Sequence, residues 1–246
     1  NQMPMGATPL HNAVEKVASY LQVPTGAQEN PWAANPSQLA SATNPEMSCR
    51  RSFNLIFSDG AWSASGSTIK GKDFDNTAGA AFERTGSVPA SSFSYAPQGP
   101  TDRRLYTPYP SSATGGLADL TAQYYWHKDL RDMLANQVAT RADQPAFWQN
   151  MTTYTVGYLI KPSGLLVGAT SGLTFDQIDA YRTGYAVDGY TAAPKPTWPP
   201  GDTTSLTPAK RVDDFIQAGY TGGGRGFSVQ TAEEIRGVFD TILSDI

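Results

Sequence analysis

The chain has 246 residues and a formal net charge of −4, which is enough length for one large domain with a sizeable buried core. Only 16% of the residues are charged, and no stretch carries the concentrated positive charge that a nucleic-acid backbone requires. No apolar run approaches the roughly 20 residues of a membrane-spanning helix. We therefore expect no nucleic-acid partner and no membrane span, and the neutral polar composition favours an exported protein.

Cysteine and histidine are scarce. Cys49 is the only cysteine, and two histidines are too few for a histidine-rich metal site. A single cysteine usually packs as a small apolar side chain, so we expect a buried thiol, although in an exported protein it can also pair with sequence outside the chain. Residues 1–4 resemble the middle of a protein and not a signal peptide, and a removed leader or an excised segment would both explain this.

The first predicted helix covers residues 9–21. Its apolar residues recur at helical spacing, at Leu10, Val14, Val17 and Leu21. Thr8 is placed to cap this helix, with Pro9 at the first helical position, where a missing N–H costs nothing. Residues 23–48 contain Pro, Gly, Asn and Ser throughout, which predicts a long loop.

A mostly apolar run at residues 52–58 predicts a strand, and such a run is typical of a buried central strand in a parallel sheet. The strand ends at Asp59, which Gly60 follows. Residues 60–115 are rich in Gly, Ser, Thr and Pro and show weak periodicity. We expect a long insertion there, with some short hairpins.

A second helix is predicted from about residue 117 to residue 135. Its apolar side consists of Leu117, Leu120, Tyr124, Leu130 and Leu134. Residues 151–160 are rich in β-branched and aromatic side chains, which predicts the next strand. Residues 162–206 form a second expected insertion, with a short helix near residues 175–181.

The last part of the chain contains two more predicted helices. The first covers about residues 208–218, and a glycine-rich turn at residues 222–226 and a short strand at residues 227–229 follow it. Thr231 caps the final helix, whose first turn holds two acidic residues where the helix dipole favours them.

Helices and strands therefore alternate along the chain, beginning and ending with a helix. This order predicts an α/β fold with a doubly wound, mostly parallel sheet and helices on both faces. Ligands of such folds bind outside the carboxyl ends of the strands. Asp59 lies at that end of the most apolar predicted strand.

Asp59 and Thr8 are the residues best placed to bind a hard cation. A carboxylate after a buried strand can coordinate Mg²⁺ directly or through water, and the hydroxyl of Thr8 at a helix start offers another oxygen. The simpler interpretation of the same residues is a turn at Asp59–Gly60 and a helix cap at Thr8.

Two segments are similar to those of a known domain type. GATPLHNA at residues 6–13 and NLIFSDG at residues 54–60 resemble the threonine segment and the Asp-Gly strand end of von Willebrand factor A domains. The resemblance implies one domain over residues 1–246 that lacks its first strand and helix. The insertions at about residues 60–115 and 162–206 would then interrupt this domain.

Four further segments extend the similarity in one consistent order. They are CRRSF at residues 49–53 with Trp62 after the strand, residues 117–131, residues 145–157, and residues 211–228. Together they resemble the N-terminal region of the PilY/PilC family of type IV pilus tip adhesins. This resemblance covers nearly the whole chain.

The resemblance implies a non-catalytic module that acts in adhesion, pilus assembly or surface sensing. Its implied location is the cell surface at the pilus tip, associated with the outer membrane, or the periplasm in transit. The implied partners are minor pilins or the pilus tip itself, and a host-surface or other extracellular ligand.

The adhesion site of von Willebrand A domains has three parts: an Asp-x-Ser-x-Ser segment, a Thr before a helix, and an Asp after a later strand. By resemblance, Thr8 and Asp59 are the second and third parts of a site for Mg²⁺, or for Mn²⁺ or Ca²⁺. No Asp-x-Ser-x-Ser occurs in the chain, so either it precedes Asn1 or the site is degenerate and holds no metal. A metal with few protein ligands keeps a position that a partner's carboxylate can fill.

A second candidate metal site is DFDNT at residues 73–77, which resembles the start of a calcium-binding loop. Such a loop requires Gly at its sixth position, where this chain has Ala78. We keep Asp73 and Asp75 as candidate calcium ligands, with a solvated turn as the alternative.

The competing hypothesis is a secreted hydrolase that uses Asp59 or Asp119 with His127. The chain lacks the Gly-x-Ser-x-Gly segment of one large hydrolase class, so we expect no catalysis and a helix-surface position for His127. A cluster of aromatic residues would suit a sugar platform, but at this density we expect core packing. The cluster consists of Tyr124, Tyr125, Trp126 and Trp148.

Overall fold

The computed structural model describes residues 8–23, 29–59, 62, 69, 71–86, 91–95, 115–141, 143–160 and 208–246. Its main sheet has three parallel strands in the order β1 (Phe53–Ser58), β4 (Thr152–Tyr158), β5 (Gly223–Val229). The α-helices are α1 (Leu10–Leu21), α2 (Leu117–Ala122), α4 (Pro208–Thr221) and α5 (Ala232–Asp245). The expected insertion at residues 162–206, with its short helix near residues 175–181, lies outside the described residues.

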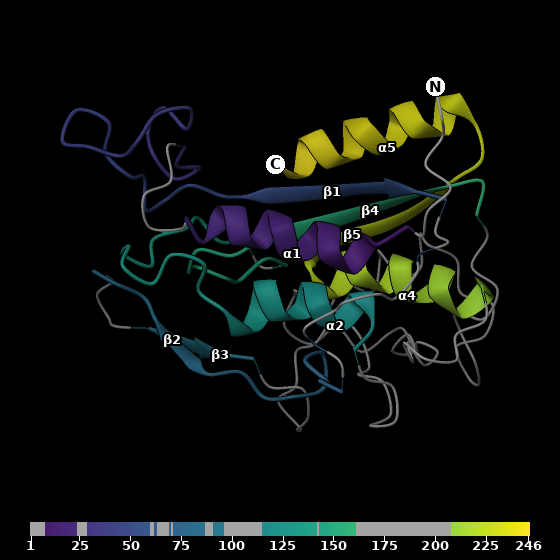
Figure 1. The fold of residues 1–246 in the computed structure, drawn as a ribbon, viewed down its shortest axis with the longest axis horizontal. Coiled ribbons are helices and arrows are strands. Elements are labelled where there is room, and N and C mark those ends of the chain that lie inside the picture. The colour runs from purple at the N-terminus through teal and green to yellow at the C-terminus, as the bar shows by residue number, and fades with distance from the viewer. Residues whose placement is uncertain are drawn as a thin grey trace.

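Helices lie on both faces of the sheet (Figure 1). Helix α5 covers one face, while α1, α2 and α4 lie on the other, where α4 contacts β4 and β5 and α2 contacts both α4 and α1. The prediction of an α/β chain with a parallel sheet is therefore confirmed. No helix among the described residues is long and apolar enough to cross a membrane.

Helix α1 begins one residue later than predicted, at Leu10, with Pro9 as its N-cap. Pro9 has no side-chain donor or acceptor, and no side chain caps the helix. Thr8 contributes only its backbone carbonyl, which accepts from the N–H of Leu10 at 2.9 Å. The prediction of a Thr8 hydroxyl cap is therefore wrong.

Strand β1 lies at an edge of the described sheet, because it pairs with β4 and with no other described strand. Asn54 and Ile56 face inward and are buried. Leu55 and Phe57, which point to the opposite face, are 42% and 50% exposed. The expectation of a buried central strand is therefore wrong for the described residues, because α5 covers β5 on that face and leaves these two side chains open.

Strand β5 begins at Gly223 and contains residues 223–226 of the glycine-rich segment that is predicted to be a turn. A Cβ on Gly226 would lie 2.3 Å from the carbonyl oxygen of Ile216 on α4. A Cβ on Gly224 would lie 2.2 Å from the carbonyl oxygen of Thr153 on β4. The glycines therefore allow β5 to pack closely against α4 and β4. The turn predicted at residues 222–226 is confirmed at Gly222 and is wrong for residues 223–226, which belong to the strand.

The predicted helix over residues 117–135 is shorter than expected. Helix α2 ends at Ala122 and continues as a single π-helical segment, η1 (Gln123–His127), after which Lys128 is extended. The carbonyls of Tyr124 and Tyr125 accept from the N–H of Met151 at 3.1 Å and from Nε1 of Trp148 at 3.0 Å. These long-range donors replace the N–H groups that a continuing helix would supply.

The insertion after β1 contains the expected short hairpin, formed by β2 (Ala81–Glu83) and β3 (Ser92–Ser94). Phe82 of this hairpin stacks on Trp148, with ring centroids 4.3 Å apart. The expected aromatic core is confirmed, because all four of its members are buried: Tyr124, Tyr125, Trp126 and Trp148. Cys49, in contrast, is exposed, so the expectation of a buried thiol is wrong.

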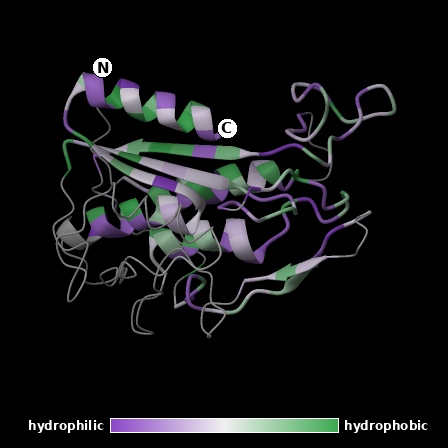
Figure 2. Cartoon of the chain, turned by 180° about the vertical axis from the view of Figure 1, so that it is seen from behind, coloured by the Kyte–Doolittle hydropathy of each residue, from purple (hydrophilic) through white to green (hydrophobic). Residues whose placement is uncertain are grey.

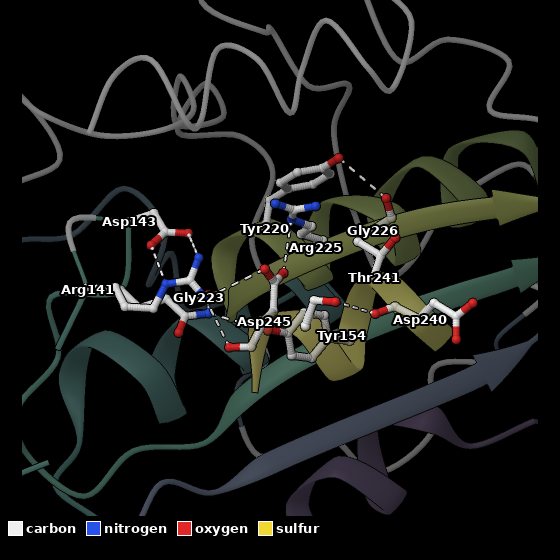
Figure 3. A network of polar contacts seen from close by, with 12 residues as sticks. Arg141, Asp143, Tyr154, Tyr220, Gly223, Arg225, Gly226, Asp240, Thr241 and Asp245 are labelled. Carbon is white, nitrogen blue, oxygen red and sulfur yellow. Dashed lines mark hydrogen bonds and ion pairs between the residues drawn. The ribbon is translucent and has the colours of Figure 1, made fainter. Parts of the chain in front are cut away.

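Helix α5 starts as predicted, since the hydroxyl of Thr231 accepts from the N–H of Glu234 at 3.2 Å. Hydrophobic and hydrophilic residues alternate along this helix (Figure 2), and Ile235, Val238 and Ile242 pack against the sheet. Its C-terminal end is held by an ion-pair network around Asp245 (Figure 3).

Candidate metal centres

The predicted adhesion residues lie at one end of the sheet. Asp59 directly follows β1 and is exposed, with Oδ1 accepting from the hydroxyl of Ser58 at 3.4 Å. Thr8 is exposed just before α1. Helix α1 begins at the end of the sheet where β1 finishes (Figure 1). Asp59 therefore lies at the carboxyl end of a parallel strand, the end at which ligands of α/β folds bind.

A buried aromatic contact holds this edge together. The rings of His11, near the start of α1, and Trp62, just beyond Asp59, meet edge to face with centroids 4.6 Å apart. Trp62 is anchored to α4 in turn, because its Nε1 donates to the carbonyl of Arg211 at 3.0 Å and its own carbonyl accepts from Nη1 of Arg211 at 2.9 Å. Trp62 therefore connects the start of α1 to α4.

The structure forms a second acidic group from separate parts of the chain. Asp73, Asp75 and Asp119 each offer a carboxylate oxygen, and these oxygens lie within 4.8 Å of one another. Asp75 and Asp119 are buried, at 2% and 4% exposure, while Asp73 is half-buried. Asp73 and Asp75 are the residues of the predicted calcium loop, and Asp119, in the first turn of α2, joins them through the tertiary fold.

Each carboxylate of this group is oriented by N–H donors. Asp119 accepts from the backbone N–H groups of Asp75 at 3.2 Å, of Gly115 at 2.8 Å and of Gly116 at 3.3 Å. Oδ2 of Asp75 accepts from Nε2 of Gln217 on α4 at 3.0 Å. These bonds connect the insertion to α2 and to α4.

Burial disfavours the ionised form of these carboxyls when no cation is present. It raises the pKa of Asp119 to about 7. The pKa of Asp75 is raised well above its usual value, first by burial and then by the charge of Asp119. Burial also raises the pKa of the neighbouring Asp214, on α4, to about 7. The site is therefore strongly electronegative and lacks a compensating positive charge among the described residues.

His127 does not form the arrangement that a hydrolase would need. Its Nε2 lies 2.7 Å from the carbonyl oxygen of Phe74, and no hydrogen bond joins it to a carboxylate among the described residues. Burial lowers the pKa of His127, which is half-buried at the end of η1 and not on a helix surface as expected. Its role within the described structure is to hold the loop that carries Asp73 and Asp75.

The sequence had suggested Asp119 only as a catalytic residue, not as a metal ligand. Its one local signal is an acidic side chain in the first turn of a helix that follows two glycines. That pattern is common wherever an acidic residue interacts with a helix N-terminus, so it does not distinguish a metal ligand from a cap.

The chain is similar over nearly its whole length to known proteins of one kind. Over 98% of its length the chain is 27% identical to the type IV pilus biogenesis factor PilY1 of Pseudomonas aeruginosa strain PAK. It is 26% identical over 100% of its length to PilY1 of strain UCBPP-PA14. The chain spans only 19% of the length of these relatives. No family model and no solved structure matches it.

Proposed function

We propose that this chain is a non-catalytic module of a type IV pilus biogenesis protein that binds a partner through a divalent cation at Asp59 and Thr8. The observation that carries the proposal is the similarity to PilY1 along essentially the whole chain. Because the chain covers about a fifth of those relatives, the module would be one part of a longer exported protein that acts at the pilus tip or cell surface.

The fold that we propose is that of a von Willebrand A domain over residues 1–246. Three parallel strands whose order in the sheet is also their order along the chain, with helices on both faces, support it. The proposal includes a further strand, from sequence before Asn1, beside β1. Among the described strands, β1 pairs on one side only. This open edge and the exposed Leu55 and Phe57 support that position, because an open apolar edge is a place for strand addition.

The chemistry of the proposed site is coordination without a reaction. Asp59 and Thr8 supply two oxygens, and the added strand would supply the Asp-x-Ser-x-Ser oxygens that this chain lacks. A carboxylate of a minor pilin, or of a host-surface ligand, would complete the shell of Mg²⁺ or Mn²⁺. Binding would then depend on the divalent ion.

The test uses the full-length protein in the cell that produces it. We expect Asp59→Ala to reduce Mg²⁺-dependent surface attachment at least tenfold and to leave the protein folded, because the exposed Asp59 side chain is not part of the core. Asp240→Ala, which removes an equally exposed carboxylate on α5, is the matched control. Wild-type attachment by the Asp59→Ala variant, or attachment of the parent protein that EDTA leaves unchanged, would refute the adhesion site.

A further inference from the structure

We infer that Asp73, Asp75 and Asp119 hold a second divalent cation, of the Ca²⁺ type, that ties the insertion after β1 to helices α2 and α4. This site shares no residue with the proposed adhesion site at Asp59 and Thr8. Its role would be structural, because two of its three carboxylates are buried.

Unpaired oxygens at the centre of the group are the first argument. One oxygen of Asp73 accepts from Nδ2 of Asn76 at 3.2 Å, and one oxygen of Asp75 accepts from Gln217 at 3.0 Å. The other oxygen of each, Oδ1, is buried and has no hydrogen-bond partner. A buried anionic oxygen without a partner is costly, and a cation bound between the carboxylates would satisfy both oxygens at once.

Charge is the second argument. Three carboxylates with oxygens within 4.8 Å of one another repel when ionised. Among the described residues, none of the three forms an ion pair with Lys, Arg or His. A divalent cation would offset two of these three negative charges without further side chains.

The ligand types indicate which cation fits. All three ligands are carboxylates, and the group contains neither a cysteine nor a histidine, which disfavours zinc. The ligands come from a loop and from a helix in irregular positions, and Ca²⁺ tolerates such irregular oxygen geometry while Mg²⁺ requires a near-ideal octahedron. The Asp73-x-Asp75 spacing also matches the first two ligand positions of a calcium loop.

The surrounding contacts explain what the cation would hold. The phenol of Tyr95, next to strand β3, donates to the carbonyl of Asp75, and the N–H of Asp75 donates to Asp119. Gln217 connects the same residue to α4. A cation bound by Asp75 would therefore join the insertion that contains the β2–β3 hairpin to helices α2 and α4.

The experiment counts bound Ca²⁺ on the full-length protein by equilibrium dialysis after removal of metals with EDTA. We expect Asp75→Asn and Asp119→Asn each to bind one Ca²⁺ fewer per chain than the parent protein. Both changes keep the shape of the side chain. Loss of one Ca²⁺ in both variants would show that the loss does not come from misfolding of a single variant. Asp240→Asn, which changes an exposed carboxylate on α5, should bind as much Ca²⁺ as the parent.

Limited proteolysis supplies the second readout. We expect EDTA to accelerate cleavage within residues 71–95 about tenfold in the parent protein, and Asp75→Asn to show the fast rate with or without Ca²⁺. The inference would be overturned if both Asn variants bound as many Ca²⁺ ions as the parent. It would also be overturned if the cleavage rate of the parent were the same with and without Ca²⁺. Because Asp59→Ala leaves this site intact, failure of the adhesion site would be visible separately.

Discussion

His11 packs edge-on against Trp62, with ring centroids 4.6 Å apart and an angle of 67° between the ring planes. Both side chains are essentially inaccessible to solvent. Thr8 lies shortly before one of them and Asp59 shortly before the other, so the contact draws the start of α1 toward the segment that leaves β1. The proposed adhesion edge therefore depends on a buried histidine.

This histidine makes the protein less stable in weak acid. Burial lowers the pKa of His11 from 6.5 to about 4. Below pH 6.5 the unfolded chain binds a proton that the folded chain accepts only near pH 4. The contribution of His11 to the free energy of unfolding is therefore complete above pH 6.5 and is lost as the pH falls toward 4. The free energy of unfolding decreases by on the order of 3 kcal/mol over this range.

The variant His11→Phe keeps an aromatic ring against Trp62 and removes the titration. We expect the free energy of unfolding of the variant, minus that of the parent, to increase steadily as the pH falls from 7 to 4.5 in urea titrations. Taking the difference cancels the opposite pH dependence of the buried carboxyls. A difference that stays constant over this pH range would contradict the prediction.

Gly223 is required at the start of β5. Its φ is +76°, and a Cβ there would lie 2.2 Å from Cε2 of the buried Tyr125. We expect Gly223→Ala to reduce the free energy of unfolding by about 2–4 kcal/mol, because it adds both backbone strain and a clash. The measurement is chemical denaturation.

Gly237 on α5 is the matched control for this substitution. A Cβ at Gly237 meets nothing within 4 Å. Gly237→Ala should therefore stabilise the protein, by up to about 1 kcal/mol, since alanine is the better helix former. Equal effects of the two alanines would show that close packing around Gly223 is not what the strand requires.

Asp245 holds the last turn of α5 to the sheet. Its carboxylate lies 3.1 Å from Nε of Arg225 on β5 and 3.6 Å from Nη1 of Arg141, and it is largely buried (Figure 3). We expect Asp245→Ala to lower the free energy of unfolding by about 2 kcal/mol, because it removes the ion pair with Arg225 from a partly buried site. Asp240→Ala, on the exposed side of the same helix, should change stability by no more than about 0.5 kcal/mol.

Hydrogen exchange localises the effect of this substitution. Relative to the parent protein, Asp245→Ala should raise the amide exchange rates of α5 more than those of β4. The helix loses its anchor, while the strand keeps its two neighbours. An equal increase in the exchange rates of α5 and β4 would indicate that the substitution destabilises the whole fold and does not act on α5 alone.

Asp214 acts as a cap for a helix that is distant in sequence. Its two carboxylate oxygens accept from the N–H groups of Leu117 at 2.8 Å and Ala118 at 3.1 Å, which are the first two residues of α2. Asp214→Ala should lower the free energy of unfolding by about 1–3 kcal/mol, because two buried donors lose their acceptor. Asp214→Asn, which keeps one acceptor oxygen, should cost less in the same urea titration.

Local sequence determined the elements whose signals are local. The apolar spacing in α1, the alternation of helices and strands, and the Thr231 cap of α5 follow from residues close together in the chain, and the structure contains each of them. Thr8 shows the limit of local reasoning, because this cap-type residue lies one position before Pro9, the N-cap of the helix that forms.

The tertiary structure decided what depends on distant neighbours. The glycine-rich segment at residues 222–226 looks like a turn by composition, but its residues 223–226 form the start of strand β5. Glycine there lets β5 approach α4 and β4 closely. The acidic group is the clearest case. Asp73 and Asp75 were visible as part of a calcium loop, whereas Asp119 reaches them only because α2 packs beside α4 and Asp75 bonds to both helices.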